Sequence, residues 1–585
     1  MANQYQADVL VVGGGTGGTA AAIQAARRGA KTILVSEFPW LGGMLTSAGV
    51  SAPDGNELEA FQTGLWGAFL QELRQRQPGG LDNNWVSFFS YDPRIGAEIF
   101  ADWVEEFPNL HWISRQVPIE VYRQGDSITG VRFADFTATA KIILDATELG
   151  DLLALADIPY RWGWELQSEW GEPSAPVTFN SLTKRYPVQA PTYVVIMQDF
   201  GEAIASEIPA APNYNPSQFT GAWDGYGAEI FLNYGRLPGG LFMINWPICG
   251  NDYAEGVGRL IESDVSRGEF IQESRWHSQN FAHFIQKQLG RRYGLAEKVF
   301  PHTPTAFALH PYYRESRRLV GLTTIREQDI LPIAGGRVAS IFNDAIALGN
   351  YANDHHYPGV QFPLQPKSIR WGGRWTGTPF TIPYSCLIPA TTDGFLVCEK
   401  NISVSHIANG ATRLQPVVMG IGQAAGMAAA MCVELNCQPR DLPVRALQTA
   451  LLEDNRSKTA IIPLFNLPPN RSDWRHWQLY YLNNPQAYPV SGDCPFPSGN
   501  EYPHSKALIR ESNCFKGIFY RLSQQEYRFT VTAPAAYQGQ NWQLVTLRSH
   551  IDEQLRAYPH EQFVTLWGRQ NHFANWLLVE HLNGG

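Results

Sequence analysis

A run of glycines near the start of the chain has the spacing of a phosphate-binding turn. Residues 8–12 form a short apolar segment, which GGGTGG at 13–18 and then a helical stretch follow. In such a turn Gly13 permits the tight bend, Gly15 lets the backbone approach a pyrophosphate, and Gly18 lets the helix pack closely on the strand. The helix N-terminus then offers free N–H groups and a partial positive charge to the phosphates. Taken alone, the pattern is also compatible with an ordinary glycine-rich turn.

The next segment supports dinucleotide binding. Residues 31–36 read as a second strand, and Glu37 follows it, about 20 residues after Gly18, where an acidic side chain accepts hydrogen bonds from the adenosine ribose and disfavours a 2′-phosphate. This combination leaves FAD and NAD open. A second glycine pair, Gly42 and Gly43, stands where the backbone can pass close to the flavin end of an extended cofactor, and it favours FAD.

Three residues are candidates for work on a substrate. Arg314 opens the sequence RESRR, where a planar guanidinium can bind a substrate carboxylate bidentately; the alternative is a salt-bridged domain junction. His355 and His356 follow Asp354 on a predicted loop. A histidine held by a carboxylate can take a proton while hydride passes to a flavin; the alternative is a structural histidine. No third ligand is spaced to complete a metal site, so we expect none.

A second small-residue segment starts near Gly420. We expect a helix there whose small side chains let its backbone approach a ring, and whose N-terminus offers N–H donors to a carbonyl such as flavin O2. The alternative is a buried alanine-rich helix that packs on a sheet. His406 and Arg413 precede this helix, and we expect both to lie close to the cofactor.

Five blocks occur together in this chain. They are GGGTGG at 13–18, DATELGD at 145–151, RESRR at 314–318, DHH at 354–356 and GQAAG at 422–426. On these blocks the chain resembles FAD-dependent oxidoreductases of the glutathione-reductase and fumarate-reductase type over residues 7–455. The resemblance implies a flavoprotein fold with a discontinuous FAD domain. No histidine lies in a covalent-flavin motif, so we expect non-covalently bound FAD. One departure is CEKN at 398–401, where many relatives have a glycine-containing turn.

The predicted FAD-binding residues come from the fingerprint, the second glycine pair, the closing strand and the segments around the Gly420 helix. They are Gly13, Gly15, Thr16, Gly17, Gly18, Glu37, Gly42, Gly43, Met44, Leu45, Val117, Ala146, Thr147, Asp151, His406, Arg413, Gly420, Gln423, Ala424 and Ala425. The predicted catalytic residues are Arg314, His355 and His356.

The order of elements predicts an α/β fold in four parts. A Rossmann-like FAD-binding domain takes residues 1–155 and 346–455, with a β-meander and closing strand near 111–114, 119–122, 130–133 and 141–144. Residues 156–345 lack βαβ alternation and form an inserted α+β substrate domain. Residues 456–585 form a small aromatic-rich α+β appendage that packs against the catalytic body. Its strands are expected at 517–522, 527–532, 542–548 and 562–568, and its helix at 552–558.

Composition narrows the class of protein further. The chain has 585 residues, of which 44% are hydrophobic and 17% charged, as in folded globular proteins. Its net charge is −9, and an acidic protein of this kind is not expected to bind nucleic acid or an anionic membrane through its overall charge. Seven scattered cysteines without a C-x-x-C pair, and no recognisable secretory signal, favour a cytoplasmic location. The longest weakly polar run, 419–433, falls short of the roughly 20 residues that cross a bilayer, so no membrane span is expected.

These observations predict an FAD-dependent oxidoreductase that transfers hydride between a small organic substrate and the flavin. A non-catalytic flavin-binding or assembly protein is the alternative, and an NAD-binding protein without flavin conflicts with the second glycine pair. Only one phosphate-binding fingerprint is present and there is no redox C-x-x-C. Electrons are therefore expected to enter from the substrate and leave to oxygen, a quinone or a carrier protein, or to pass in reverse. The sequence identifies neither the substrate nor the electron acceptor.

Overall fold

The computed structural model describes residues 3–365, 370–495 and 513–582. Its centre is a five-stranded parallel sheet in the order β19-β8-β2-β3-β4. These strands are Phe395–Val397, Ile142–Asp145, Val9–Val12, Thr32–Ser36 and Leu110–Ser114. The first four are buried along their whole length. Parallel strands covered on both faces read as continuous apolar runs, as these do in the sequence.

Helices α1 and α10 pack against each other beside this sheet; they are Thr16–Arg27 and Gln415–Leu435. Their backbones come very close. A Cβ added to Gly422 would lie 2.1 Å from the carbonyl oxygen of Gly17, and one added to Gly426 would lie 2.1 Å from that of Ala21. Two glycines of the GQAAG block therefore serve to fit α10 against α1.

Helix α10 begins earlier than the sequence predicts. We expected it to start near Gly420, but it starts at Gln415, because Pro416 fits the first turn, where its missing N–H group costs no hydrogen bond. The apolar run at 419–433 is thus part of a helix of 21 residues. Among the described residues it is the one helix whose length and composition suit a membrane span, and 89% of its apolar window is buried inside the protein.

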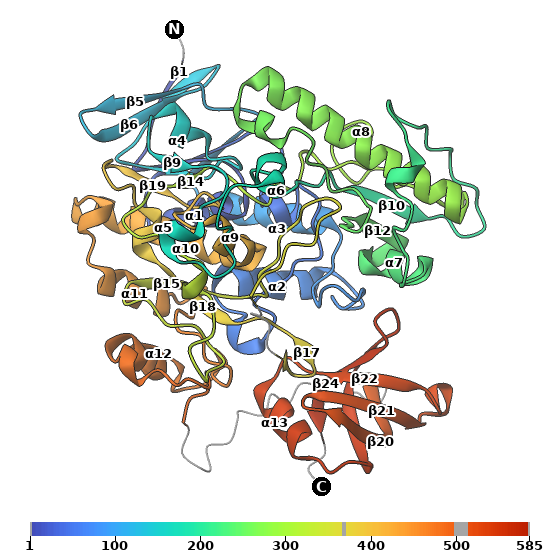
Figure 1. Ribbon diagram of the computed structural model, residues 1–585. Coiled ribbons are helices and arrows are strands. Elements are labelled where there is room, and N and C mark those ends of the chain that lie inside the picture. Colours follow the sequence, from blue (N-terminus) through green and yellow to red (C-terminus); the bar gives the residue numbers. More distant parts are fainter. Residues whose placement is uncertain (1–2, 366–369, 496–512, 583–585) are drawn as a thin grey trace.

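A smaller four-stranded sheet, in the order β1-β7-β6-β5, lies at one end of the molecule (Figure 1). The strands are Asn3–Gln6, Phe136–Thr139, Ser127–Arg132 and Glu120–Gln124. The predicted meander is confirmed in its middle strands. The predicted closing strand near 141–144 is β8 of the parallel sheet, but the segment near 111–114 is β4 of that sheet and does not belong to the meander. Hydrophobic periodicity identifies a strand but does not reveal which sheet it joins.

The insertion carries an antiparallel sheet of its own, in the order β11-β12-β10-β13. Its strands are Arg236–Leu237, Leu241–Ile244, Val195–Asp199 and Tyr293–Leu295. The long helix α8, Asp264–Leu289, lies along it at the upper right of Figure 1. Side chains such as Ile196, Phe242 and Phe281 form its core, which Met44 of the N-terminal part joins. The exact domain limits stay a prediction.

The remaining elements connect these layers. The helices are α2 Gly64–Arg76, α3 Pro93–Glu105, α4 Asp151–Leu155, α5 Gln167–Trp170, α6 Ser181–Arg185, α7 Ala228–Tyr234, α9 His406–Thr412, α11 Val444–Leu452 and α12 Trp474–Asn483. The strand pairs are β9 Tyr160–Arg161 with β14 Arg318–Leu319, β15 Ala345–Asn350 with β18 Pro379–Pro383, and β16 Arg370–Trp371 with β17 Arg374–Trp375.

The C-terminal residues form a closed barrel in the order β20-β21-β22-β24-β23, drawn in red in Figure 1. Its elements are Cys514–Ser523, Glu526–Ala533, Asn541–Val545, α13 Ser549–Ala557, Gln562–Asn571 and Trp576–Leu582. The predicted strands and helix are present, but the last strand was missed. It pairs parallel with β22 and closes the barrel, so the expected α+β appendage is a five-stranded barrel with one helix, as in OB-type barrels.

Candidate functional site

The glycine turn after β2 packs tightly on the strands beside it. A Cβ added to Gly13 would lie 2.0 Å from the carbonyl oxygen of Ala146, and Cβ atoms on Gly17 and Gly18 would lie 1.8 and 2.1 Å from other backbone oxygens. Gly15 is different, because a Cβ added to it would lie 2.6 and 3.2 Å from the carboxylate oxygens of two side chains rather than from backbone. Backbone atoms therefore leave no room for a side chain at Gly13, Gly17 or Gly18, whereas Gly15 lies next to polar side chains.

Those side chains belong to a buried ion cluster. Glu399 accepts a hydrogen bond of 2.7 Å from the N–H of Gly17, and the Lys400 ammonium lies 2.6 Å from Glu148 and 3.1 Å from Glu399. Burial raises the pKa of Glu399 to about 7. Burial acts the same way on Glu148, but the Lys400 charge outweighs it and lowers the pKa of that carboxyl. The departure noted at 398–401 thus places a charged pair at the start of α1.

The second glycine pair covers the first turn of α1. The Thr16 hydroxyl donates a hydrogen bond of 2.7 Å to the carbonyl of Gly42, and a Cβ added to Gly43 would lie 2.8 Å from the Thr16 nitrogen. Both glycines have positive φ, 100° and 51°, which other residues rarely adopt. Met44 and Leu45 follow as fully buried side chains. The two glycine segments therefore form one structure.

The end of β3 presents an accessible carboxylate. Glu37 is exposed to solvent and makes no hydrogen bond to another described residue, although the protein atoms around it raise its pKa to about 7. Asp151 interacts with it electrostatically and is itself held by Arg267 at 2.7 Å and Arg317 at 2.9 Å. Val117 is 47% exposed. The residue before it, Gln116, donates its backbone N–H to the carbonyl of Ser36, the last residue of β3.

The DATELGD block is a hydrogen-bonded turn at the end of β8. Thr147 donates from its N–H and its hydroxyl to the Asp145 carboxylate, at 2.9 and 2.7 Å. The same hydroxyl accepts the N–H of Asp151 at 2.6 Å. Burial raises the pKa of Asp145 to about 7. The block therefore fixes the backbone of Ala146 against Gly13.

Within α10, the predicted cofactor residues contact protein. Gln423 accepts an N–H from the first turn of α2 at 2.8 Å and donates to a carbonyl after α11 at 2.9 Å. Ala424 and Ala425 are completely buried, and a Cβ on Gly420 would touch a side chain of β15 at 3.4 Å. Their role toward a cofactor stays a prediction. The start of the helix offers a different group, the buried side chain of Gln415.

Several buried polar atoms near this helix start have no hydrogen-bond partner within the described ranges. They are Asn56 Oδ1, Asn350 Oδ1, Asn353 Oδ1, Arg413 Nε and Gln415 Oε1, with Glu148 Oε1 beside Gly15. Unpaired buried polar atoms are costly and rare, so these atoms suit a bound polar molecule. Together with the free Glu37 carboxylate, they fit FAD, whose ring edge, hydroxyl groups and phosphates need both donors and acceptors.

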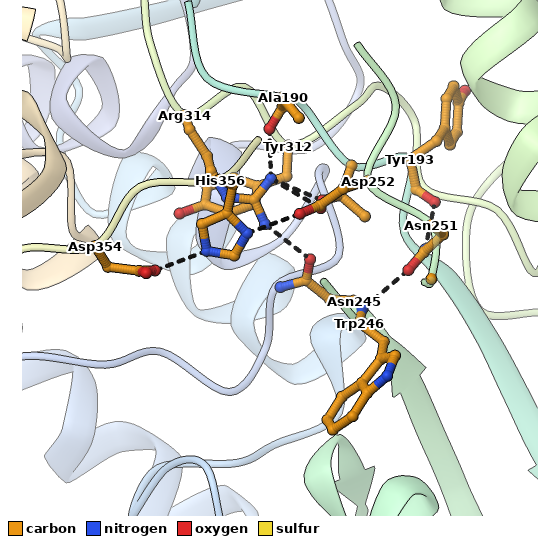
Figure 2. A network of polar contacts seen from close by, with 12 residues as sticks. Ala190, Tyr193, Asn245, Trp246, Asn251, Asp252, Tyr312, Arg314, Asp354 and His356 are labelled. Carbon is orange, nitrogen blue, oxygen red and sulfur yellow. Dashed lines mark hydrogen bonds and ion pairs between the residues drawn. The ribbon is translucent and has the colours of Figure 1, made fainter. Parts of the chain in front are cut away.

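Figure 2 shows His356 between two carboxylates. Its Nδ1 lies 2.7 Å from Asp252 and its Nε2 lies 2.7 Å from Asp354. Burial and the Arg314 charge lower the pKa of His356, but Asp354 and Asp252 outweigh them, so the net direction is upward. Each ring nitrogen also faces a carboxylate oxygen, which accepts hydrogen bonds, so this geometry favours the doubly protonated ring. His356 is a fixed cation, and our expectation that it takes a proton directly is not met by this geometry.

Two arginines complete the network. Arg314 is buried, lies 3.1 Å from Asp252 and donates to the carbonyl of Ala190 at 2.6 Å (Figure 2). Its guanidinium is committed to these partners, as in the domain-junction alternative, so it is poorly placed for the expected carboxylate clamp. Arg413 lies 3.3 Å from Asp354, whose side chain keeps 41% of its surface exposed. Asp354 is the accessible end of the network.

His355 does not join this network. Its Nε2 lies 3.0 Å from the carbonyl of Ile407 and its Nδ1 lies 2.8 Å from the hydroxyl of Tyr357. That hydroxyl lies 2.6 Å from His406 Nε2, and His406 Nδ1 lies 2.8 Å from Glu315. The carbonyl of Ile407 only accepts, so neutral His355 donates to it through Nε2 and accepts the Tyr357 hydroxyl hydrogen at Nδ1. The Tyr357 oxygen then accepts a hydrogen bond from Nε2 of neutral His406, which leaves His406 Nδ1 as an acceptor toward Glu315. One proton must then lie between His406 and Glu315.

The pKa values place that proton on the carboxyl. Burial lowers the pKa of His355 and His406 to about 3 and raises the pKa of Glu315 to about 7. Neither histidine has a free ring nitrogen, because protein atoms engage all four. The structure therefore separates the predicted set: Arg314 and His356 are brought together, and His355 and His406 lie in a second chain of hydrogen bonds.

Some residues of the site were not predicted. Asp252 lies far from the DHH block in sequence and belongs to no motif that marks it. Tyr357 follows the two histidines directly, and this adjacency was a usable signal.

No group of three or more His, Cys, Asp or Glu side chains in the described ranges is arranged to hold a metal ion. The seven cysteines are all free thiols.

A sequence model of the family described as FAD dependent oxidoreductase matches residues 8–451. Among solved structures, a geranylgeranyl bacteriochlorophyll reductase-like protein from Thermoplasma acidophilum is 11% identical, with a TM-score of 0.31, over 83% of this chain and 89% of that one. Aquifex aeolicus GidA is 16% identical, with a TM-score of 0.21, over 33% of this chain and 34% of that one. L-proline dehydrogenase from P. horikoshii is 13% identical, with a TM-score of 0.23, over 34% and 62%. No curated protein sequence matched.

Proposed function

Because the chain belongs to the FAD-dependent oxidoreductase family and FAD is its cofactor, we propose that it transfers a hydride between a small organic substrate and non-covalently bound FAD beside the His356 network. FAD supplies the two-electron chemistry when bound. The observation that carries the proposal is the Asp354 carboxylate, which is accessible and held in place by His356 and Arg413. It lies next to the unpartnered polar atoms at the start of α10.

The charge of this network indicates the substrate class. Burial alone would raise the pKa of Asp354, but His356 and Arg413 outweigh it and hold the pKa well below its usual range. An ionised carboxylate accepts hydrogen bonds. The proposed substrate therefore carries a hydroxyl or amino group that donates to Asp354. His356 acts as a positioning residue, since it orients Asp354 and balances its charge.

The nucleotide half of FAD is assigned to the N-terminal segments. We infer that Gly15 and the start of α1, apart from the Gly17 N–H that Glu399 already engages, face the pyrophosphate, and that Glu37 accepts hydrogen bonds from the ribose. Gly42 and Gly43 support the first turn of α1. The domain limits and the cytoplasmic location remain expectations from the sequence.

An absorption spectrum and an anaerobic screen test the proposal. The purified protein should show a flavin spectrum, and an alcohol or amine from a metabolite panel should bleach its long-wavelength band. His356→Gln should slow that bleaching by about 10²-fold or more, because Asp354 loses its orientation. His476→Gln, on the exposed face of α12, is the control and should not change it.

Each outcome separates the alternatives. A protein that cannot be reconstituted with FAD would contradict the cofactor assignment. A flavin spectrum with no response to any compound would favour the non-catalytic flavin-binding alternative. Normal bleaching in His356→Gln would show that the His356 network takes no part in the reaction.

A further inference from the structure

A second carboxyl lies at the edge of the His356 network. Asp54 is in a loop that packs against the start of α10: a Cβ on the next residue, Gly55, would lie 3.5 Å from the carbonyl oxygen of Asn350 and 3.6 Å from the Leu414 side chain. Leu414 is the N-cap of α10, and Asn350 ends β15, from which the chain continues to Asp354. The loop thus lies beside the unpartnered polar atoms described above.

Asp54 is surrounded but accessible. It interacts electrostatically with Asp354, Arg413, Glu57 and Arg374, and two tyrosines of the same site, Tyr234 and Tyr351, interact with it as well. Its side chain keeps some solvent exposure while its sequence neighbours are buried, and it makes no hydrogen bond to another described residue. A polar group in this position is free to bond to a ligand.

The two acids of the site are in opposite states. Burial, with the neighbouring Glu57 charge, raises the pKa of Asp54 to about 8, although Arg374 and Arg413 oppose this. Asp354, by contrast, is held ionised by His356 and Arg413. A pair of carboxyls with separated pKa values is the usual arrangement of an acid or base beside a charged positioning group.

The C-terminal barrel contacts the hairpin that carries Arg374, whose charge acts on Asp54. The tip of the β16–β17 hairpin binds the barrel through Gly372, whose N–H donates to Asp552 at 3.1 Å and whose carbonyl accepts from Thr546 at 2.8 Å. The next residues carry the Arg374 guanidinium, 5.3 Å from the ring centre of Trp576.

On its other side Arg374 meets the catalytic body. Its guanidinium lies 4.6 Å from the ring centre of Phe88 and 3.8 Å from the buried Glu57 carboxylate. One side-chain oxygen of Glu57 and one nitrogen of Arg374 have no hydrogen-bond partner in the described part of the chain. A barrel that lies outside the family match at 8–451 thus contributes to the charge balance around Asp54.

We propose that Asp54 is a further catalytic residue, the group that exchanges a proton with the substrate, and that the barrel holds Arg374 in place to control it. The proposal rests on the proposed function. When the substrate is oxidised, its C–H bond gives a hydride to FAD, the oxidant, and an O–H or N–H bond other than the one that Asp354 binds gives a proton to the Asp54 carboxylate. A C=O or C=N bond forms. In the reverse direction the Asp54 carboxyl returns the proton.

The pH dependence of flavin reduction tests this assignment. The reductant is the compound that bleaches the wild-type flavin, and the rate is measured anaerobically by stopped flow. Only ionised Asp54 accepts a proton, so the wild-type rate should rise with pH and level off above about 8. Asp54→Asn should be about 10²- to 10⁴-fold slower and lose this inflection. Asp54→Glu, which keeps the carboxyl, should retain an inflection.

The barrel's part is tested with Arg374. Arg374 lowers the pKa of Asp54, so Arg374→Gln should move the inflection to higher pH, and Arg374→Lys should restore it. Arg548→Gln is the matched control, because Arg548 pairs with Glu59 at 3.8 Å across the same barrel–body interface. It should leave the inflection unchanged.

Difference infrared spectroscopy gives a readout that needs no substrate. The wild-type protein should lose a protonated-carboxyl band near pH about 8 that Asp54→Asn lacks at every pH. No Asp54-dependent band, or a rate profile in Asp54→Asn that matches the wild type, would overturn the assignment. If no compound bleaches the wild-type flavin, the proposed function fails first and this proposal fails with it.

Discussion

Replacing Glu315 by glutamine isolates the proton that the second hydrogen-bond chain requires. Glu315 is buried, accepts the N–H of Gln189 at 3.2 Å and faces His406 Nδ1, which needs a donor. A glutamine amide supplies both, since its oxygen accepts and its nitrogen donates. The variant therefore reproduces the hydrogen bonds of the protonated acid, and Arg318 keeps its second partner, Glu165, at 2.7 Å.

The sign and size of the effect follow from the pKa of Glu315. Burial raises it from 4.5 to about 7, so between these values the folded protein keeps a proton that the unfolded chain loses. The contribution of Glu315 to wild-type stability therefore falls as pH rises through this window and is constant above it. At about 1.4 kcal/mol per pKa unit, Glu315→Gln should gain about 3 kcal/mol over the wild type between the two limits.

Urea unfolding between pH about 5 and about 8 measures the difference in unfolding free energy between variant and wild type. Glu273→Gln is the control, because its hydrogen bond to Arg259 lowers the pKa of Glu273. That variant should be slightly less stable than the wild type, with no trend over the same window. A flat difference for Glu315→Gln would refute the proton placement, and with it the neutral state of His406.

The remaining predictions concern the cofactor site and the His356 network. Gly422→Val places a side chain on the Gly17 carbonyl and should abolish FAD binding, whereas Gly420→Ala, with 3.4 Å of space, should bind normally; flavin content after purification decides. Gly15→Arg should yield a folded protein without flavin, so stoichiometric flavin would contradict the pyrophosphate assignment. Glu37→Ala should raise the Kd for FAD by about 10- to 100-fold, measured by fluorescence titration, because a charged hydrogen bond contributes about 1.5–3 kcal/mol. Asp252→Asn leaves Arg314 and His356 without their shared anion and should destabilise the protein by about 3–5 kcal/mol, measured by thermal and urea unfolding.

Local sequence was sufficient for the elements that carry the nucleotide turn. The apolar run before Gly13, the glycine spacing and the acid after the next strand are all contiguous signals, and the structure forms β2, α1 and β3 there. The start of α10 was predicted too late because the run of small residues begins only near Gly420. The packing of Gly422 on Gly17 could not be predicted, because the two residues lie about 400 positions apart in the chain.

The His356 network was only half predictable from the sequence. Arg314 and His356 stand in conspicuous blocks, but their shared partner Asp252 is a single acid that precedes both in the chain and belongs to no block. Neighbouring histidines look alike in sequence, and only the fold shows that His355 turns toward Ile407 while His356 turns toward Asp252. The charge state of Asp54 likewise arises from its surroundings and leaves no trace in local sequence.

The pairing of the first helix with the tenth sets an order for biosynthesis. The glycine turn packs against the chain that follows β19 and against α10. These elements are Phe395–Val397 and Gln415–Leu435, so they are synthesised long after the turn. A ribosome adding about 5–20 residues per second takes roughly 20–80 s between the two halves. During that time the glycine turn lacks the contacts of β19 and α10, so flavin must be acquired after most of the chain has been made.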